Sequence, residues 1–519
     1  MPRSVYAIAL AALAAHLATL SRYGFYRDEL YFIACFKRMA WGFVDQPPLV
    51  PLIAGLSPSV HGGLFATRVF AALAAAITIL CAAAVARQLG AGTFGQIVTA
   101  IATALMPGSL FLGNTLTTTS FEPLTWTLSV LLVLLAARDR RMWIASALLI
   151  AIAAYMKYSI FLLCGAMLLG MLGFRRFRDA GLLTCATAGA IVLLLPNILW
   201  QAQHGFPMAV VLHGDVTGRH AFNAGAQYEF SGSLQNAPAF LAEQFAFAGP
   251  LSAPLWIAGV FALFRRWTRL NAAYLGAAYF IAVAVGLLTA AKGYYIIGMY
   301  PALFAAGGVA LERAGRPLRV WYAATLTAAG LLLAPLTIPM LSVNTLVAYM
   351  HAFGAPPKLV QPLFADEFGW RALTKTVAQQ YTALPANERA RIPVFADTYG
   401  VAAALEYYGP QYGLPQPISA QNQYYLWGTR GYDLSRMLAV GASEYWTLKK
   451  LYRNVRMVAT FEDPYRWVVE GPTPIYLCTD PIVPVSEIWP ALRWYGAENP
   501  FRYTPRRAGD CSRARRQLA

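Results

Sequence analysis

The feature that most restricts the fold of this chain is a succession of long apolar stretches. Runs of about 18 or more apolar residues predict transmembrane helices, and about eleven such runs follow one another in this sequence. The segment 142–173 can be divided into two short runs in more than one way. The approximate limits of the runs are 4–20, 64–87, 93–112, 117–136, 142–156, 158–173, 180–199, 250–265, 271–290, 294–311 and 320–341.

Composition agrees with a polytopic α-helical membrane protein. Charged residues make up 13% of the 519 residues, against about 25% in soluble domains, and the mean hydropathy is +0.48. These values exclude a soluble fold. The first run begins Met1-Pro2-Arg3 and is rich in alanine, as a signal peptide is. Because no convincing cleavage site follows it, we expect it to be retained as a helix.

The distribution of charge predicts how the chain crosses the membrane. Residues 1–341 contain 22 Lys and Arg against 10 Asp and Glu, and the arginines gather in every second loop. Since positively charged loops face the cytoplasm, we expect a cytoplasmic N-terminus, eleven spans and an outer C-terminus in a bacterial inner membrane. The net charge of +17 therefore indicates membrane topology and no nucleic-acid partner. The arginine-rich loops are 138–141, 175–178, 265–269 and 313–319.

The composition changes near residue 342, where charge and proline content rise. No later segment is long and apolar enough to span a membrane. We therefore expect a membrane domain over 1–341 and an extracytoplasmic soluble α/β domain over 342–519. Within the second domain, the patterns are typical of strands at 393–396 and 466–469 and of helices at 371–383 and 433–452.

The sequence does not decide whether the two cysteines of the outer domain form a disulfide. Cys478 and Cys511 would both face an oxidising compartment. They either pair or stay free, and the sequence does not choose between these states. The arginine-rich tail after residue 502 is predicted to be disordered.

Acidic residues concentrate in the first outer loop, about residues 21–63. Asp28 and Glu29 stand side by side, and Asp45 follows before Pro47, Pro48 and Pro51. The run Leu30–Ala34 with Lys37 and Arg38 predicts a short amphipathic helix at the membrane interface, which the prolines should break. Seven of the ten acidic residues of the membrane half lie in the outer loops, namely Asp28, Glu29, Asp45, Glu122, Asp215, Glu229 and Glu243.

The acidic pair has two interpretations. Asp28 and Glu29 are either solvated loop charges, with Asp28 capping the amphipathic helix, or they include a general base that deprotonates an acceptor hydroxyl or amine. A carboxylate near an apolar interface has a raised pKa because desolvation disfavours its charge, which suits proton uptake near neutral pH. Asp45 would orient the same site or bind the acceptor.

Two lysines lie against apolar runs on the same side. A cation at the bilayer centre costs about 2.5–3.5 kcal/mol, so such residues are functional candidates. Lys157 and Lys292 either extend to the interface or bind an anion, most naturally a phosphate. Carboxylates beside such cations are what an enzyme needs to transfer a sugar from a lipid phosphate, because the cations stabilise the leaving phosphate.

A group of histidines follows the seventh apolar run. His204, His213, Asp215 and His220 lie close in sequence, but their spacing matches no established metal-ligand pattern. Structural or substrate-contact roles are favoured over a metal site.

Several of these segments resemble the bacterial dolichyl-phosphate-mannose protein mannosyltransferase-like family of the GT-C superfamily. Lipid A aminoarabinose transferases and polyprenyl-phosphate-sugar-dependent lipopolysaccharide-core transferases are related to it. The similarity rests on the order of the motifs along most of the chain. The matching segments are Tyr26–Tyr31, Trp41–Leu49, Thr117–Leu124, Lys157–Ser159, Trp200–Pro207, Lys292–Pro301, Tyr399–Leu405 and Asn422–Gly428.

The resemblance implies a GT-C fold and an inverting sugar transfer at the outer membrane face. The donor would be a polyprenyl-phosphate sugar and the acceptor a lipid, glycan or protein, with membrane lipids as the surroundings. Asp28 would be the base with Glu29 beside it, and Asp45 and Glu122 would bind or orient the acceptor. The transfer requires no metal, and the sequence does not decide whether a divalent cation binds.

The same resemblance assigns a donor side. Lys157, Lys292 and Tyr295 would bind the donor phosphate. Weaker substrate contacts would come from Gln46, His204 and Tyr294. The aminoarabinose transferases have a lysine where this chain has Gln46, so their sugar specificity does not carry over.

Two other functions compete with the enzyme. A transporter or lipid flippase would bind near the midplane and often shows paired repeats, whereas this sequence shows no repeat and gathers its polar residues on one side. A non-catalytic membrane scaffold would tolerate substitution of Asp28, Asp45 and Lys157.

Overall fold

The computed structural model describes residues 1–56, 63–216, 237–289, 291–354, 362–441, 445–466 and 472–496. The chain divides into two compact units. The first consists of Met1–Gly369 with Asp463–Val469, and the second of Trp370–Glu462 with Glu470–Ala519. The first two helices after residue 341, Val343–Ala352 and Pro362–Ala365, therefore belong to the first unit. The boundary between the units follows Gly369.

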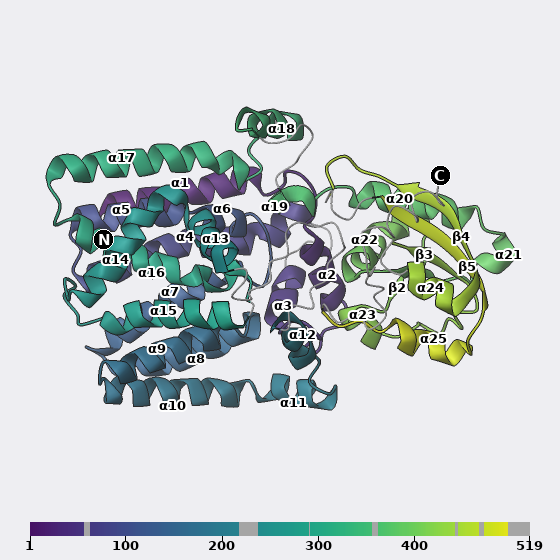
Figure 1. Ribbon diagram of the computed structural model, residues 1–519, viewed down its shortest axis with the longest axis horizontal. Coiled ribbons are helices and arrows are strands. Elements are labelled where there is room, and N and C mark those ends of the chain that lie inside the picture. The colour runs from purple at the N-terminus through teal and green to yellow at the C-terminus, as the bar shows by residue number, and fades with distance from the viewer. Residues whose placement is uncertain are drawn as a thin grey trace. The chain divides into compact units, whose positions relative to one another are not determined.

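The first unit is a bundle of apolar helices (Figure 1), and each predicted apolar run overlaps one of them. Among the described residues, three helices are long and apolar enough to cross a membrane, or up to five if each bent pair is one span. The shorter apolar helices overlap the other predicted runs. The main helices are α1 (Arg3–Thr19), α4 (Gly63–Leu89), α5 (Thr93–Ala104), α7 (Glu122–Ala136), α8 (Met142–Met156), α9 (Ile160–Gly173), α10 (Phe177–Leu193), α14 (Ala253–Phe264), α15 (Ala273–Leu288), α16 (Tyr300–Leu311) and α17 (Arg316–Leu333).

Helix α16 lies at the centre of this bundle, and residues 300–310 are buried. It packs against α14, α4 and α5. Small residues permit this close approach, as at many membrane helix interfaces. A Cβ added to Gly307 would lie 2.1 Å from the carbonyl oxygen of Leu255, and one added to Gly259 would lie 2.1 Å from that of Leu303.

Gly307→Val is therefore expected to lower the thermal stability of the protein and its yield of folded material. Overpacking costs about 1–3 kcal/mol, and here the obstacle is backbone, which yields less easily than a side chain. The measurement is the melting temperature in detergent. Gly165→Val in α9 is the matched control, because a Cβ there meets nothing within 4 Å. Equal melting temperatures for the two variants would contradict this packing account.

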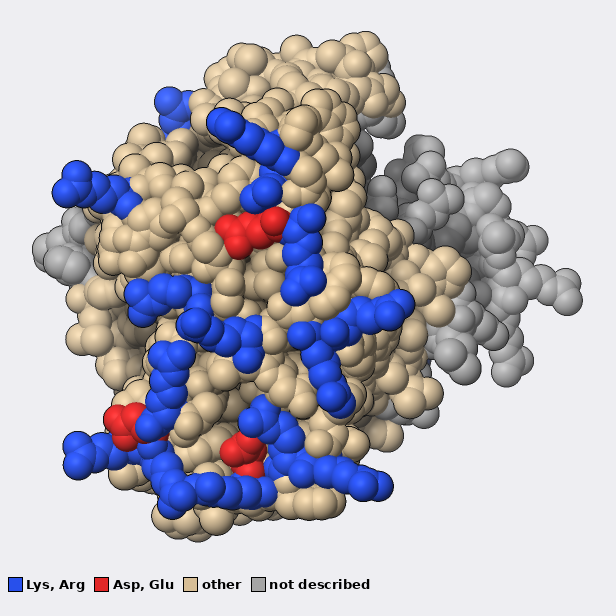
Figure 2. Space-filling view, turned by 90° about the vertical axis from the view of Figure 1, so that its left-hand side faces the viewer, with Lys and Arg blue, Asp and Glu red and all other residues tan. Residues whose placement is uncertain are grey.

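Short elements cluster at one end of the bundle (Figure 1). The opposite end, shown in Figure 2, carries many Lys and Arg side chains and few Asp and Glu. Which end faces the cytoplasm stays a prediction. The short elements of the first unit are α2 (Arg27–Phe36), α3 (Leu49–Leu56), α6 (Pro107–Leu112), α11 (Leu195–Gln203), α12 (Pro207–Val216), α13 (Ala237–Ala248), η3 (Pro250–Ser252), η4 (Gly293–Met299), η5 (Ala334–Leu336), α18 (Val343–Ala352) and α19 (Pro362–Ala365).

The helix predicted in the first loop is confirmed as α2, in which residues 29–35 are all buried. Its position at a membrane interface stays a prediction. The prediction that Pro51 breaks helical structure was wrong, because Pro51 is the third residue of α3. A proline in the first helical turn removes only an N–H that has no partner within the helix. Pro47 and Pro48 do precede α3 and separate it from α2.

The second unit contains a five-stranded sheet with the order β2-β1-β3-β5-β4. β1 pairs in parallel with β2 and β3, and β5 pairs antiparallel with β3 and β4. The strands are β1 (Val394–Ala396), β2 (Ile418–Ser419), β3 (Met437–Val440), β4 (Tyr452–Phe461) and β5 (Thr473–Pro481). The helical elements are α20 (Trp370–Thr382), α21 (Ala386–Arg389), α22 (Tyr399–Tyr408), η6 (Gly409–Tyr412), α23 (Asn422–Leu426), α24 (Tyr445–Leu451) and α25 (Val485–Leu492).

The predicted strand 393–396 and helix 371–383 are confirmed as β1 and α20. The helix predicted over 433–452 was wrong in its first half, since residues 437–440 form β3 and α24 begins only at Tyr445. All four residues of β3 are buried, and a short apolar run of this kind fits a buried strand as well as a helix. Of the predicted strand 466–469, Arg466 lies in a bend and the rest lies outside the described residues.

Candidate active site

The first acidic segment forms the start of α2. The carboxylate of Glu29 accepts a hydrogen bond from the backbone N–H of Tyr26 at 2.7 Å. This bond satisfies a backbone N–H at the helix start that has no partner within the helix. It also accepts the backbone N–H of Leu116 at 2.9 Å. The Glu29 side chain is completely buried, so it fixes the geometry of this turn.

Arg68 of α4 is the charged partner of Glu29. Its Nε donates to one carboxylate oxygen at 2.7 Å and its Nη2 to the other at 2.9 Å. The same Nη2 donates to a second carboxylate, Glu367, at 3.2 Å. Each of the three side chains is at most 1% exposed. A two-point guanidinium–carboxylate contact fixes orientation as well as distance.

Asp28, the neighbour of Glu29, has a different environment. Its side chain is 30% exposed, and one carboxylate oxygen lies 4.0 Å from Nε of Arg27. Nη2 of Arg27 lies 3.3 Å from the carboxylate of Asp366. Asp28 is therefore the carboxylate of the acidic pair that a solute can reach.

Asp45 belongs to the loop between α2 and α3. It accepts a hydrogen bond from the hydroxyl of Tyr31 at 2.9 Å and is partly exposed. Gln46 beside it is 3% exposed, and its amide nitrogen lies 3.7 Å from Sγ of Cys35. The structure therefore turns Gln46 inward, while Asp45 stays near the surface.

Lys157 follows α8 in an extended backbone conformation. Its Nζ donates to the carboxylate of Glu122 at 2.6 Å and to Oγ1 of Thr119 at 2.9 Å. The same nitrogen lies 5.2 Å from the ring centroid of Tyr294 and 4.8 Å from that of Tyr295. Glu122 is 1% exposed and Lys157 is 17% exposed. The structure thus pairs Glu122, which the motifs assigned to the acceptor, with Lys157, which they assigned to the donor phosphate.

The two tyrosines are held by contacts between η4 and α13. The backbone N–H of Gly293 donates to Glu243 at 3.0 Å, and its carbonyl accepts the amide of Gln244 at 3.1 Å. Gln244 also accepts the hydroxyl of Tyr300 at 2.9 Å. Lys292 is the residue that precedes η4, with an extended backbone.

Tyr26 links the acidic turn to this second cluster. Desolvation is the main cause that raises its pKa, and the negative charges of Asp366 and Asp28 raise it further. Tyr294 also acts electrostatically on Tyr26, and Tyr294 packs on Lys157. Electrostatic interactions of Tyr26 thus connect Asp28 with the tyrosine that packs on Lys157.

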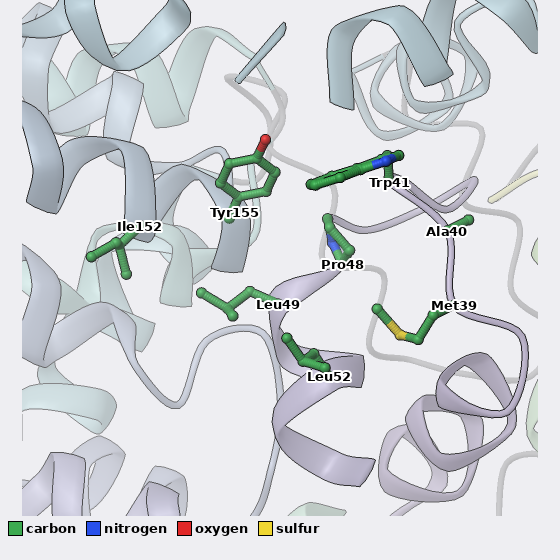
Figure 3. Close-up of a pocket in the computed structure, with 8 residues that line it drawn as sticks. All are labelled: Met39, Ala40, Trp41, Pro48, Leu49, Leu52, Ile152 and Tyr155. Carbon is green, nitrogen blue, oxygen red and sulfur yellow. The ribbon is translucent and has the colours of Figure 1, made fainter. Parts of the chain in front are cut away.

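An apolar cavity of about 540 Å³ opens beside the first loop (Figure 3). Helix α3 and the loop before it supply one wall, and Ile152 and Tyr155 of α8 supply the other. Tyr155 is two residues before Lys157 in sequence. The lining residues are Met39, Ala40, Trp41, Pro48, Leu49, Leu52, Ile152 and Tyr155.

The histidines do not form a metal site in the described part of the chain. His204 is exposed and stacks on Trp200 with ring centroids 4.1 Å apart. His213 lies in α12, the side chain of Asp215 is not described, and His220 lies outside the described residues. Among the described residues, no group of three or more His, Cys, Asp or Glu is placed to hold a metal ion. Cys478 is buried, whereas Cys511 lies outside the described residues.

Comparison with known proteins identifies the fold. Residues 45–200 match the model of the family Dolichyl-phosphate-mannose-protein mannosyltransferase. ArnT from Cupriavidus metallidurans bound to undecaprenyl phosphate superposes with a TM-score of 0.59 at 14% identity, over 91% of this chain and 97% of that chain. The protein has the GT-C glycosyltransferase fold. Apo ArnT gives a TM-score of 0.58 with the same identity and coverage.

This result confirms the resemblance inferred from the motifs. The family match includes Asp45, Glu122 and Lys157, whereas Asp28 precedes its first residue. No curated protein sequence matches the chain. At 14% identity the likeness to ArnT shows the GT-C fold and does not by itself assign a role to any residue.

Sequence reasoning missed Arg68 and Glu367. Arg68 is a charged residue within the predicted span 64–87, so the rule that singled out Lys157 also applies to it. Glu367 carries no comparable signal, because it follows the last apolar run and stands 299 positions from Arg68.

Proposed function

We propose that this GT-C protein is an inverting glycosyltransferase that uses a polyprenyl-phosphate sugar. It would move the sugar to a hydroxyl or amine of a lipid, glycan or protein at the outer face of the membrane. The observation that carries the proposal is the partly exposed carboxylate of Asp28, which interactions of Tyr26 connect to the cluster of the Lys157–Glu122 ion pair. A base and a phosphate-binding cation are the two groups that such a transfer requires.

The chemistry is a single displacement. Asp28 accepts the proton of the acceptor hydroxyl or amine while that oxygen or nitrogen forms a bond to the anomeric carbon. The bond from this carbon to the phosphate oxygen breaks, and its electron pair leaves with the polyprenyl phosphate. Inversion follows because the acceptor attacks the face opposite the leaving group.

Lys157 is suited to stabilise the charge of the leaving phosphate. Its ammonium group has three hydrogens, and two are directed at Glu122 and Thr119. The third is available to a phosphate oxygen. The rings of Tyr294 and Tyr295 limit the positions of the ammonium group, so it is oriented before the substrate arrives. Glu122 thus acts through Lys157, and Lys292 and Tyr295 are further donor-side residues.

The apolar cavity suits the isoprenoid chain of the donor. Its walls are mostly hydrocarbon (Figure 3), and Tyr155 of its α8 wall is two residues before Lys157 in sequence. ArnT, which has this fold, was solved with undecaprenyl phosphate. A chain seated here would bring its phosphate towards the ammonium group.

Leu49→Asp is expected to raise KM for the polyprenyl donor by about tenfold, which corresponds to about 1.4 kcal/mol of lost binding. The added carboxylate must lose its hydration when the chain enters, whereas turnover at saturating donor should change little. Initial rates over a range of donor concentrations measure this. Leu49→Met keeps an apolar wall and serves as the control. A tenfold fall in kcat with unchanged KM would place the isoprenoid chain elsewhere.

The proposed function is tested by adding a polyprenyl-phosphate sugar and an acceptor glycolipid extract to the protein in liposomes. The expected product is a glycosylated acceptor whose anomeric configuration is opposite to that of the donor. Retained configuration would contradict single displacement. Movement of intact donor across the bilayer without sugar transfer would favour the transporter or flippase.

A further inference from the structure

We propose that Glu367 is a positioning residue for Asp28, and that its cluster with Arg68 and Glu29 keeps its geometry only while Glu367 is protonated. This inference rests on the proposed function for its consequence in catalysis. The buried cluster itself is a separate claim about folding, so the two can fail independently.

The cluster joins three distant parts of the first unit. Glu29 lies in α2, Arg68 in α4, and Glu367 in the segment after α19. One guanidinium nitrogen, Nη2 of Arg68, contacts Glu29 at 2.9 Å and Glu367 at 3.2 Å. Nη2 also donates to the carbonyl of Gly24 at 2.9 Å. These contacts fix the chain immediately before and within the turn that carries Asp28.

Backbone packing adds to this connection. A Cβ on Gly24 would lie 2.1 Å from the carbonyl oxygen of Glu367, so the two chain segments are in direct contact. Asp366 pairs with Arg27 at 3.3 Å. The segment carrying Asp366 and Glu367 therefore holds Arg27 directly and Glu29 through their common partner Arg68. If this segment shifts, the base shifts with it.

Charge balance makes the cluster sensitive to pH. It contains one guanidinium and two carboxylates, with no more than 1% exposure for any of them. An uncompensated buried charge costs several kcal/mol, so the neutral arrangement is favoured. Desolvation raises the pKa of Glu367 from 4.5 to about 8, opposed by Arg68 and supported by Glu29 and Asp366. Tyr23 also interacts with Glu367. Desolvation and the charge of Glu367 raise the pKa of Tyr23 to about 12.

The direction of the effect follows from proton linkage. The pKa of Glu367 is higher in the folded protein than in the unfolded chain, so the folded state binds more protons between 4.5 and about 8. The contribution of Glu367 to stability is therefore present at low pH and is lost as the pH rises through this window. Above it, two buried carboxylates compete for one guanidinium, and the turn that carries Asp28 loosens.

Glu367→Gln tests the proposal because a glutamine keeps the shape and the neutral charge of the protonated glutamate. The fall in wild-type melting temperature between about pH 5 and about pH 8 should be smaller in this variant. The ratio of transfer rate at about pH 9 to that at about pH 7 should rise several-fold relative to wild type. Glu367→Ala should lower kcat with little change in donor KM, since Asp28 moves and Lys157 does not.

Glu487→Gln is the matched control, because Glu487 is an exposed glutamate of the second unit. It should reproduce both wild-type pH profiles. If the transfer rate changes with alkaline pH in the same way in wild type and Glu367→Gln, the positioning role of Glu367 is overturned. If the melting profile changes as expected but no donor supports transfer by the wild type, the buried proton is supported and the proposed function fails.

Discussion

Asp28→Asn is expected to reduce the rate of sugar transfer by about 10²–10⁴-fold, the usual contribution of a general base. Asparagine keeps the size of the side chain but has no basic oxygen of comparable strength. The donor phosphate site is unchanged, so KM for the donor should stay close to that of the wild type. Initial rates with purified protein measure both quantities.

The control for Asp28→Asn is Asp366→Asn. Asp366 is a second carboxylate of the same site, 13% exposed and paired with Arg27 at 3.3 Å. Its loss should disturb Arg27 and reduce the rate much less than loss of Asp28. If Asp28→Asn retains transfer within a few-fold of wild type, Asp28 is not the base.

Lys157→Met is expected to lower kcat/KM by about 10²–10³-fold, as removal of one preorganised donor to a developing charge does. The methionine keeps much of the side-chain volume. The change also leaves Glu122, which is 1% exposed, without its cation. Breaking one side of a buried ion pair costs about 3–5 kcal/mol, so the melting temperature should fall as well.

A double variant separates these two effects of Lys157→Met. Adding Glu122→Gln removes the buried unpaired charge, so Lys157→Met/Glu122→Gln should recover stability while transfer stays low. If transfer recovers together with the melting temperature, the function of Lys157 is only to neutralise Glu122, and the phosphate must bind elsewhere.

The helical bundle could be predicted because hydrophobic length is a local property of the sequence. Each apolar run overlaps a helix, and one end of the bundle carries many Lys and Arg side chains (Figure 2). The local signal was weaker where elements are short. The sequence predicts that residues 437–440 are part of a helix, whereas they form β3. The sequence pattern does not reveal this because β3 pairs with strands that are distant in sequence.

The sequence singles out residues of the candidate site but does not show which of them lie together. Asp28, Asp45, Glu122 and Lys157 were all singled out from the sequence. Their pairing was not, because Glu122 and Lys157 are 35 positions apart and nothing local relates them. Burial likewise decides that Glu29 stabilises the turn while Asp28 faces solvent, and neighbouring positions in a sequence do not reveal this difference.

The most direct test of the account is a stoichiometry measurement on purified wild-type protein reconstituted in liposomes. A panel of polyprenyl-phosphate sugars, labelled in the sugar, is incubated with a membrane-glycolipid extract as the source of acceptor. The account predicts that one donor releases free polyprenyl phosphate in amounts equal to the sugar gained by the acceptor, and that Asp28→Asn slows both by about 10²–10⁴-fold. Protein shown to be folded that releases no polyprenyl phosphate from any donor, while intact donor crosses the bilayer, would contradict it.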